Sequence, residues 1–308
     1  MILRRLAAFV PIVIAVSVLI FLALRVVPGD PVTVLTAGSP VGEDVKAQLR
    51  REFDLDKPLV AQYFLWAGDA IRGDLGISLK SRVEVTELLG QSFPVTLTLL
   101  VGGLILSLLI SIPLGVIAAL RQGSLLDQAI IGGTLVFLSI PIFTAGILGI
   151  LVFSFWLDWL PSFGRGDGFG LDRLEHLILP WGVLALALTA AQTNTLRAGM
   201  LDVLNRDYIL AAEGRGLRRR AVLRHALRTA LVPVVTILGV QFGYMIVGTV
   251  LVDYVFGLGG IGQLLVDSVN QRDYPVIQAI VVMIAIAFTA ATLLVDLVCN
   301  WLDPRYGE

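Results

Sequence analysis

The sequence predicts an all-α integral membrane protein with six transmembrane helices. Of its 308 residues, 56% are hydrophobic and only 15% are charged, and the mean hydropathy is +0.86. Several apolar runs reach the roughly 20 residues that a helix needs to cross a hydrocarbon core about 30 Å thick. The charged residues are unevenly distributed along the chain, so they predict the topology as well.

The first transmembrane helix is expected within residues 1–27. Arg4 and Arg5 precede an apolar run from Leu6 to Leu24. A signal peptide would have a shorter apolar region, followed by a cleavage site of small residues. An uncleaved spanning helix is therefore the better interpretation.

Residues 28–94 form a long polar segment that we expect outside the cytoplasm. Val45, Leu49 and Phe53 recur at helical spacing, and "PLVAQYFLWAGDAI" is rich in aromatic and aliphatic residues. This pattern predicts short helices packed against the outer face. The segment can be a plain cap or a docking surface for another protein, and the sequence favours neither.

The five other spans are expected in residues 95–302, which form the core of the predicted bundle. With the first span at about 6–27, the apolar runs place them at about 95–119, 129–157, 177–200, 231–252 and 278–302. Residues 303–308 are left as a short tail. Six spans put both termini on the same side of the membrane.

Loop charges orient the bundle, because Lys and Arg near short loops resist translocation. Residues 197–228 contain eight arginines against three acidic residues, a net charge of +5. Residues 157–176 and 253–275 each have a net charge of -2. The loop between the fourth and fifth spans is therefore predicted to be cytoplasmic, together with both termini.

Motifs for covalent chemistry are not found. Gly257, Gly259 and Gly262 match a dinucleotide fingerprint in spacing, but that fingerprint needs a strand before it and a helix after it, so a tight glycine turn is expected. The chain has no phosphate-binding loop ending in Gly-Lys-Ser/Thr. His176 and His225 are far apart without a nearby cysteine, so neither a metal site nor a catalytic residue is predicted. No nucleic-acid partner is expected.

Polar residues within the predicted spans are candidates for a translocation path, because their burial in hydrocarbon is costly unless they pair or face water. The candidates are Gln192, Asn194, Gln241 and Tyr244. Asp296 and Asn300 are polar residues of the same kind. Hydrogen bonds between helices explain each of them equally well.

A short amphipathic helix is predicted in the cytoplasmic loop 201–230. "LDVLNRDYILAAEGRGL" places Leu201, Leu204, Tyr208 and Ala211 or Ala212 on one helical face, followed by small residues and by Gly216 as a helix stop. The arginines that follow can be explained by membrane anchoring, because basic residues attract anionic lipid. Small side chains allow close approach by another protein, so we expect a cytoplasmic partner here.

These residues also carry a family resemblance. "RDYILAAEGRGL…RHALRTALVPVVTILGVQ" resembles the cytoplasmic EAA loop of ABC-importer permeases, in the version found in B-type permeases for dipeptides, oligopeptides and nickel. "LRVVPGDPV", "FDLDKPLVAQY", "RGDLGISL", "SIPLGVIAALRQGSLLD" and "RDYPVIQA" match elsewhere, so the resemblance covers nearly the whole chain. Thr229 stands where asparagine is expected, and Gly259 where proline is usual.

The resemblance implies the type I importer fold in a bacterial plasma membrane. It implies a coupling helix that sits in a groove of an ATP-binding subunit, made by Asp207, Tyr208, Ala211, Ala212, Glu213 and Gly216. It further implies a second homologous permease subunit, two ATP-binding subunits and an extracytoplasmic substrate-binding protein. ATP and Mg would be bound by the partner ATPases, with no cofactor in this chain.

The expected function is that of a permease subunit that moves di- or oligopeptides by alternating access. A nickel or other small-solute importer is the alternative within the family, because the motifs do not encode the ligand. An ion-coupled secondary transporter that acts without ATPases is the alternative from another class. It would need paired acidic residues deep in the spans, and only Asp296 comes near that description. A membrane scaffold is disfavoured by the polar residues in spans four to six.

Overall fold

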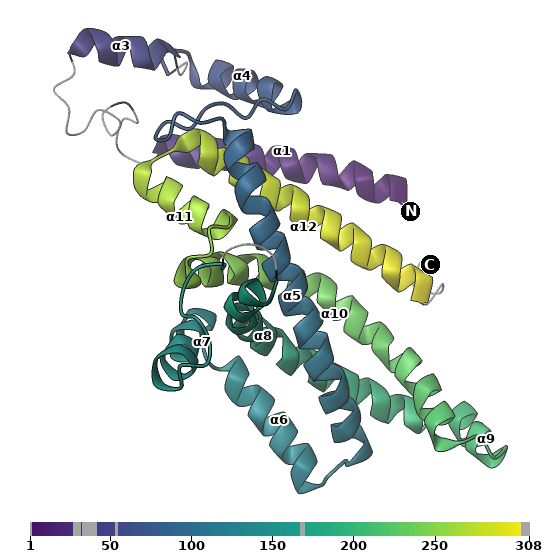
Figure 1. The fold of residues 1–308 in the computed structure, drawn as a ribbon. Coiled ribbons are helices and arrows are strands. Elements are labelled where there is room, and N and C mark those ends of the chain that lie inside the picture. The colour runs from purple at the N-terminus through teal and green to yellow at the C-terminus, as the bar shows by residue number, and fades with distance from the viewer. Residues whose placement is uncertain (1, 27–31, 33–41, 53–54, 167–169, 303–308) are drawn as a thin grey trace. The chain divides into compact units, whose positions relative to one another are not determined.

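The computed structural model describes residues 2–26, 32, 42–52, 55–166 and 170–302. These residues are mostly helical (Figure 1), and their single β feature is an isolated bridge between Ile77 and Glu84. The chain divides into two compact units, residues 1–96 with 259–289 and residues 97–258 with 290–308. The all-α prediction is confirmed, while the tail 303–308 lies outside the described residues.

Within the described residues, five helices are long and apolar enough to cross a bilayer. They correspond to the first, second, fourth, fifth and sixth expected spans. They are α1 (Ile2–Val26), α5 (Val85–Leu120), α8 (Leu171–Leu204), α10 (Arg219–Phe256) and α12 (Tyr274–Leu302).

The third expected span, 129–157, is not one straight helix. It is made of α6 (Leu125–Leu138), α7 (Ile142–Gly149) and the π-helix η1 (Ile150–Trp156), with a bend of 100° after α6. Pro141 lacks a backbone N–H and disfavours a helical conformation in the residue before it, so the helix ends there. The described chain therefore has five spans, or six if the bent pair counts as one.

In the unit formed by residues 1–96 and 259–289, the described part of residues 28–94 contains two short helices, one of which contacts α1. These helices are α3 (Glu43–Glu52) and α4 (Leu59–Ile71). Tyr63 of α4 packs edge-on against Phe21 of α1, with ring centroids 5.4 Å apart, and its hydroxyl lies 2.9 Å from Ser17 Oγ. Val45 is exposed rather than packed, and Phe53 lies outside the described residues.

The same unit contains a buried carboxylate that sequence analysis missed. Asp273 lies between α11 (Ile261–Gln271) and α12 and is 3% exposed. It accepts hydrogen bonds from Ser78 Oγ at 2.5 Å and from the backbone N–H groups of Leu79 and Lys80 at 3.0 and 3.3 Å. Three donors offset the cost of burying the charge, so Asp273 ties the turn before α5 to the start of α12.

In the unit formed by residues 97–258 and 290–308, small residues bring α5, α8 and α10 close together. Gly102 of α5 lies against the indole of Trp181, and Gly199 of α8 lies against the backbone of Ala230 in α10. Close approach of this kind is typical of membrane helix packing. The buried core near the C-terminal end of α8 includes Leu196, Met200 and Ile209.

The predicted tight glycine turn after the fifth span is confirmed. Gly257 ends α10 in the left-handed conformation with φ +60°, and Gly259 has φ +77°. The segment before the turn is helical, so the context of a dinucleotide-binding fold is missing here.

Candidate functional site

The segment predicted to contact a cytoplasmic partner consists of two helices joined by a break, not of one continuous amphipathic helix. α8 ends at Leu204, and α9 spans Asp207–Gly214. Asn205 Nδ2 donates to the carbonyl of Leu201 at 2.9 Å, and such bonds to the backbone compete with helix continuation. The expected common face of Leu201, Leu204 and Tyr208 is therefore wrong, because the first two lie on α8 and the third on α9.

α9 lies at the tip where α8 ends and α10 begins (Figure 1). Ile209 anchors it, since this side chain is 1% exposed and belongs to the core cluster with Val203 of α8 and Val222 of α10. Burial of one such side chain contributes about 1.5–3 kcal/mol. Ile209 therefore packs α9 onto both α8 and α10.

The residues predicted to contact an ATPase gather on and just after α9. Tyr208 is 47% exposed, Asp207 and Ala211 are exposed, and Ala212 is partly buried. Glu213 lies within α9, but its side chain is outside the described part of the chain. Of the described side chains here, Ala211 and Ala212 are small and Tyr208 is large, so close approach by a partner stays a prediction.

Gly216 ends the segment as predicted. It is exposed, with φ +77° and no atom within 4 Å of the position that a Cβ would take. The N–H of Leu217 donates to the carbonyl of Ala212 at 3.3 Å, which is the long bond of a Schellman motif. Side chains other than glycine are strained in this conformation.

An ion pair near this end of the bundle was not predicted. Arg197 of α8 donates to both carboxylate oxygens of Asp127 in α6, from Nε at 2.6 Å and from a terminal nitrogen at 2.7 Å. Asp127 is 3% exposed and also accepts from the N–H of Gly123 at 2.9 Å. Sequence analysis counted Arg197 only as a loop charge. The spacing from Ser124 to Asp127 is that of a capping box, so the sequence could have predicted the start of α6 but not the pairing of Asp127 with Arg197.

We expect Asp127→Asn to lower the free energy of unfolding by about 3 kcal/mol, the low end of the range for breaking a buried ion pair, because Arg197 keeps some access to water. Thermal unfolding of the purified protein in detergent would measure the loss. Arg206→Ala is the control, since its pair with Asp202 is exposed on both sides and such pairs contribute little. Equal melting temperatures for the two variants would contradict the expectation.

Two of the four translocation-path candidates are bonded to each other inside the bundle. Gln192 is fully buried, and its Nε2 donates to Ser107 Oγ and to Gln241 Oε1, each at 3.2 Å. Its Oε1 accepts from Ser111 Oγ at 2.9 Å. This network joins α5, α8 and α10, which agrees with the alternative that these polar residues form hydrogen bonds between helices. Asn194 is partly buried and takes no part in the network.

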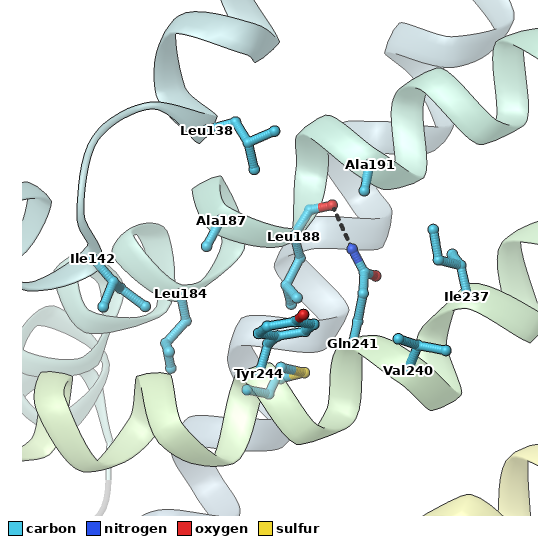
Figure 2. A pocket seen from close by; sticks show the side chains of 11 residues that line it. Leu138, Ile142, Leu184, Ala187, Leu188, Ala191, Ile237, Val240, Gln241 and Tyr244 are labelled. Carbon is cyan, nitrogen blue, oxygen red and sulfur yellow. Dashed lines mark hydrogen bonds between the residues drawn. The ribbon is translucent and has the colours of Figure 1, made fainter.

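Gln241 and Tyr244 also line a partly open cavity of about 360 Å³ between α6, α7, α8 and α10. Both side chains project from α10 toward the Leu188 to Ala191 stretch of α8 (Figure 2). The other nine of the eleven lining residues are apolar. Gln192 and Asn194 do not line it, and the side chains of Asp296 and Asn300 are outside the described residues.

A metal site is not seen in the described ranges, where no three His, Cys, Asp or Glu side chains gather. The candidate functional features of the described chain are therefore the exposed helix α9 and an apolar cavity with two polar groups. Neither is an arrangement for covalent catalysis.

Two family descriptions match this sequence. The binding-protein-dependent transport system inner membrane component matches residues 111–308, and the N-terminal part of the same kind of component matches residues 1–100. Together they cover nearly all of the chain.

Full-length relatives agree with this match. The probable peptide ABC transporter permease protein y4tP of Sinorhizobium fredii and the oligopeptide transport system permease protein AppB of Bacillus subtilis are each 39% identical, over 99% of this chain and 98% of theirs. The dipeptide transport system permease protein DppB of Escherichia coli K12 is 36% identical over 99% of this chain and 97% of its own.

Members of this family are multi-pass inner-membrane permeases rather than enzymes, and they act with ATPase and substrate-binding partners. The spans, the exposed helix α9 and the matches over the full length lead to the same assignment. The chain belongs to the family of inner-membrane components of binding-protein-dependent transport systems, the permease subunits of ABC importers.

Proposed function

We propose that this chain is one of two homologous permease subunits of an importer for di- or oligopeptides. The observation that supports the substrate class is the similarity, over essentially the whole length, to three permeases named for peptide, oligopeptide and dipeptide transport. The complete importer would also contain two ATP-binding subunits, which bind ATP and Mg, and an extracytoplasmic receptor that delivers the peptide.

The coupling role is assigned to α9 and the residues beside it. Asp207, Tyr208, Ala211, Ala212, Glu213 and Gly216 would sit in a groove of an ATP-binding subunit. The exposed small residues of α9 support this contact, and the burial of Ile209 supports transmission to α8 and α10. Closure of the ATPases would then move the bundle between inward-open and outward-facing states.

The proposed orientation of the chain in the membrane has both termini in the cytoplasm. Its support is the net charge of +5 in residues 197–228, together with the position of α9 in the same segment. In this orientation α9 lies on the cytoplasmic side, where the ATP-binding subunits would be. The orientation and the coupling role therefore both depend on the positive charge of the segment that contains α9.

Uptake by the assembled importer in vesicles tests the proposal. The chain is expressed with its copurifying partners, and alanine peptides of two to five residues are offered with saturating receptor. We expect uptake only when ATP and the ATPase subunits are present. Uptake without the ATPases would overturn the proposal in favour of an ion-coupled transporter, and uptake of Ni²⁺ but of no peptide would overturn the substrate class.

A further inference from the structure

We propose that the cavity between α6, α7, α8 and α10 receives an apolar side chain of the peptide in transit. This inference rests on the proposed function and adds a selectivity site to it. No charged side chain lines the cavity, and nine of its eleven lining residues are apolar. Because burying an unpaired charge is costly, the charged ends of a peptide would stay outside.

The size of the cavity suits one large side chain. Its volume of about 360 Å³ is more than twice that of an apolar protein cavity of about 150 Å³ that binds benzene. It lies toward the lower end of the roughly 300–1,000 Å³ found for ligand pockets. The volume is therefore sufficient for a phenylalanine or leucine side chain.

Gln241 places a side-chain amide in the wall of this cavity. Its Oε1 accepts from Gln192 at 3.2 Å, and its Nε2 donates to the carbonyl of Leu188 at 3.3 Å (Figure 2). A primary amide has two N–H groups, and the second has no partner among the described residues. A peptide backbone carbonyl at the cavity can accept it, whereas a lipid acyl chain has no acceptor to offer.

The cavity also lies where a transport site is expected. It is lined by the middle of α8, from Leu184 to Ala191, and by the middle of α10, from Ile237 to Met245. Leu138 and Ile142 line it from the two sides of the 100° bend in the third span. Non-helical backbone at membrane depth is tolerated where it lines a cavity, and discontinuous helices near the midplane form many transport sites.

Tyr244 marks the entrance to the cavity. Its side chain lines the cavity, and the residue is nevertheless 75% exposed. Tyrosine has an apolar ring and a polar hydroxyl, so it suits a boundary between an apolar cavity and a polar path. The peptide backbone would then pass along the Tyr244 side while one side chain enters the cavity.

Filling the cavity tests this inference. Ala187→Leu and Ala191→Leu each add three carbon atoms at a lining position, and Ala198→Leu on the exposed side of α8 is the matched control. The assembled importer, with saturating receptor, is offered alanine peptides with and without one phenylalanine. We expect the uptake ratio of phenylalanine-containing to all-alanine peptide to fall about tenfold in the lining variants, the lower end of discrimination by an apolar pocket.

The remaining outcomes separate the alternatives. An unchanged ratio in both lining variants would overturn the inference and leave peptide import intact. Loss of the second permease subunit from the purified variants would also overturn it, since a side chain of that subunit would then be the occupant. Absence of uptake of every peptide by the unmodified importer would overturn the proposed function, and the cavity assignment with it. Melting temperatures no lower than that of the unmodified protein check that the variants fold.

Discussion

Replacing Ala212 by glutamate is expected to reduce ATP-dependent uptake strongly while leaving the protein folded in the membrane. Ala212 lies on α9, where the proposed contact with an ATPase requires small side chains. A charged side chain at a closely packed protein interface can cost 2 kcal/mol or more, about 30-fold in affinity. Copurification of the ATPases and uptake in vesicles would both fall at least about 30-fold.

Ala221→Glu is the matched control for this variant. Ala212 and Ala221 are both partly buried, but Ala221 lies in the first turn of α10, where the helix N-terminus tolerates an acidic side chain. We expect this control to keep its ATPases and its uptake. If Ala212→Glu also kept both, α9 would not be the coupling helix, and the assignment of Gly216 and its neighbours would fall with it.

Adding a single methyl group at Gly102 is expected to disrupt the bundle. A Cβ there would lie 2.1 Å from Cε2 and 2.2 Å from Nε1 of Trp181, far inside van der Waals contact. Trp181 cannot move away easily, because its indole N–H donates to the carbonyl of Thr98 at 3.1 Å. α5 and α8 would have to separate, and overpacking of this kind costs about 3 kcal/mol.

Gly90→Ala is the control on the same helix. No atom lies within 4 Å of the Cβ position at Gly90, and replacing glycine by alanine in a helix stabilises it by about 0.5–1 kcal/mol. Thermal unfolding in detergent should therefore separate the two variants clearly. Trp181→Phe, which removes part of the indole, should restore some stability to Gly102→Ala. Similar melting temperatures for Gly102→Ala and Gly90→Ala would show that the two helices are not in close contact.

Local features of the chain could be predicted because their causes are local. Hydropathy over about 20 residues reports whether a segment can cross the membrane, and it placed the spans within α1, α5, α8, α10 and α12. The turn at Gly257 and the helix stop at Gly216 follow from the conformational freedom of glycine. The loop charges that predict the orientation are read directly from the sequence.

The breaks within helices were predicted less well. Pro141 is visible in the sequence, yet proline is tolerated inside other helices of this chain, at Pro180 in α8 and Pro233 in α10. A proline leaves backbone groups of its helix without hydrogen-bond partners. Whether it bends a membrane helix depends on whether neighbouring groups supply those hydrogen bonds. The break at Asn205 likewise depends on a side-chain bond that competes with the helix.

By itself, the sequence determined the membrane class, the number and order of the apolar segments and the family. The tertiary structure alone decided which polar groups meet. Gln192 and Gln241 are 49 residues apart, Asp127 and Arg197 are 70 apart, and Ser78 and Asp273 are 195 apart. Such pairs form when helix packing brings distant segments together, so no periodicity in the chain predicts them. The same packing leaves a cavity beside Gln241, because the walls come from four helices whose spacing is set by their contacts.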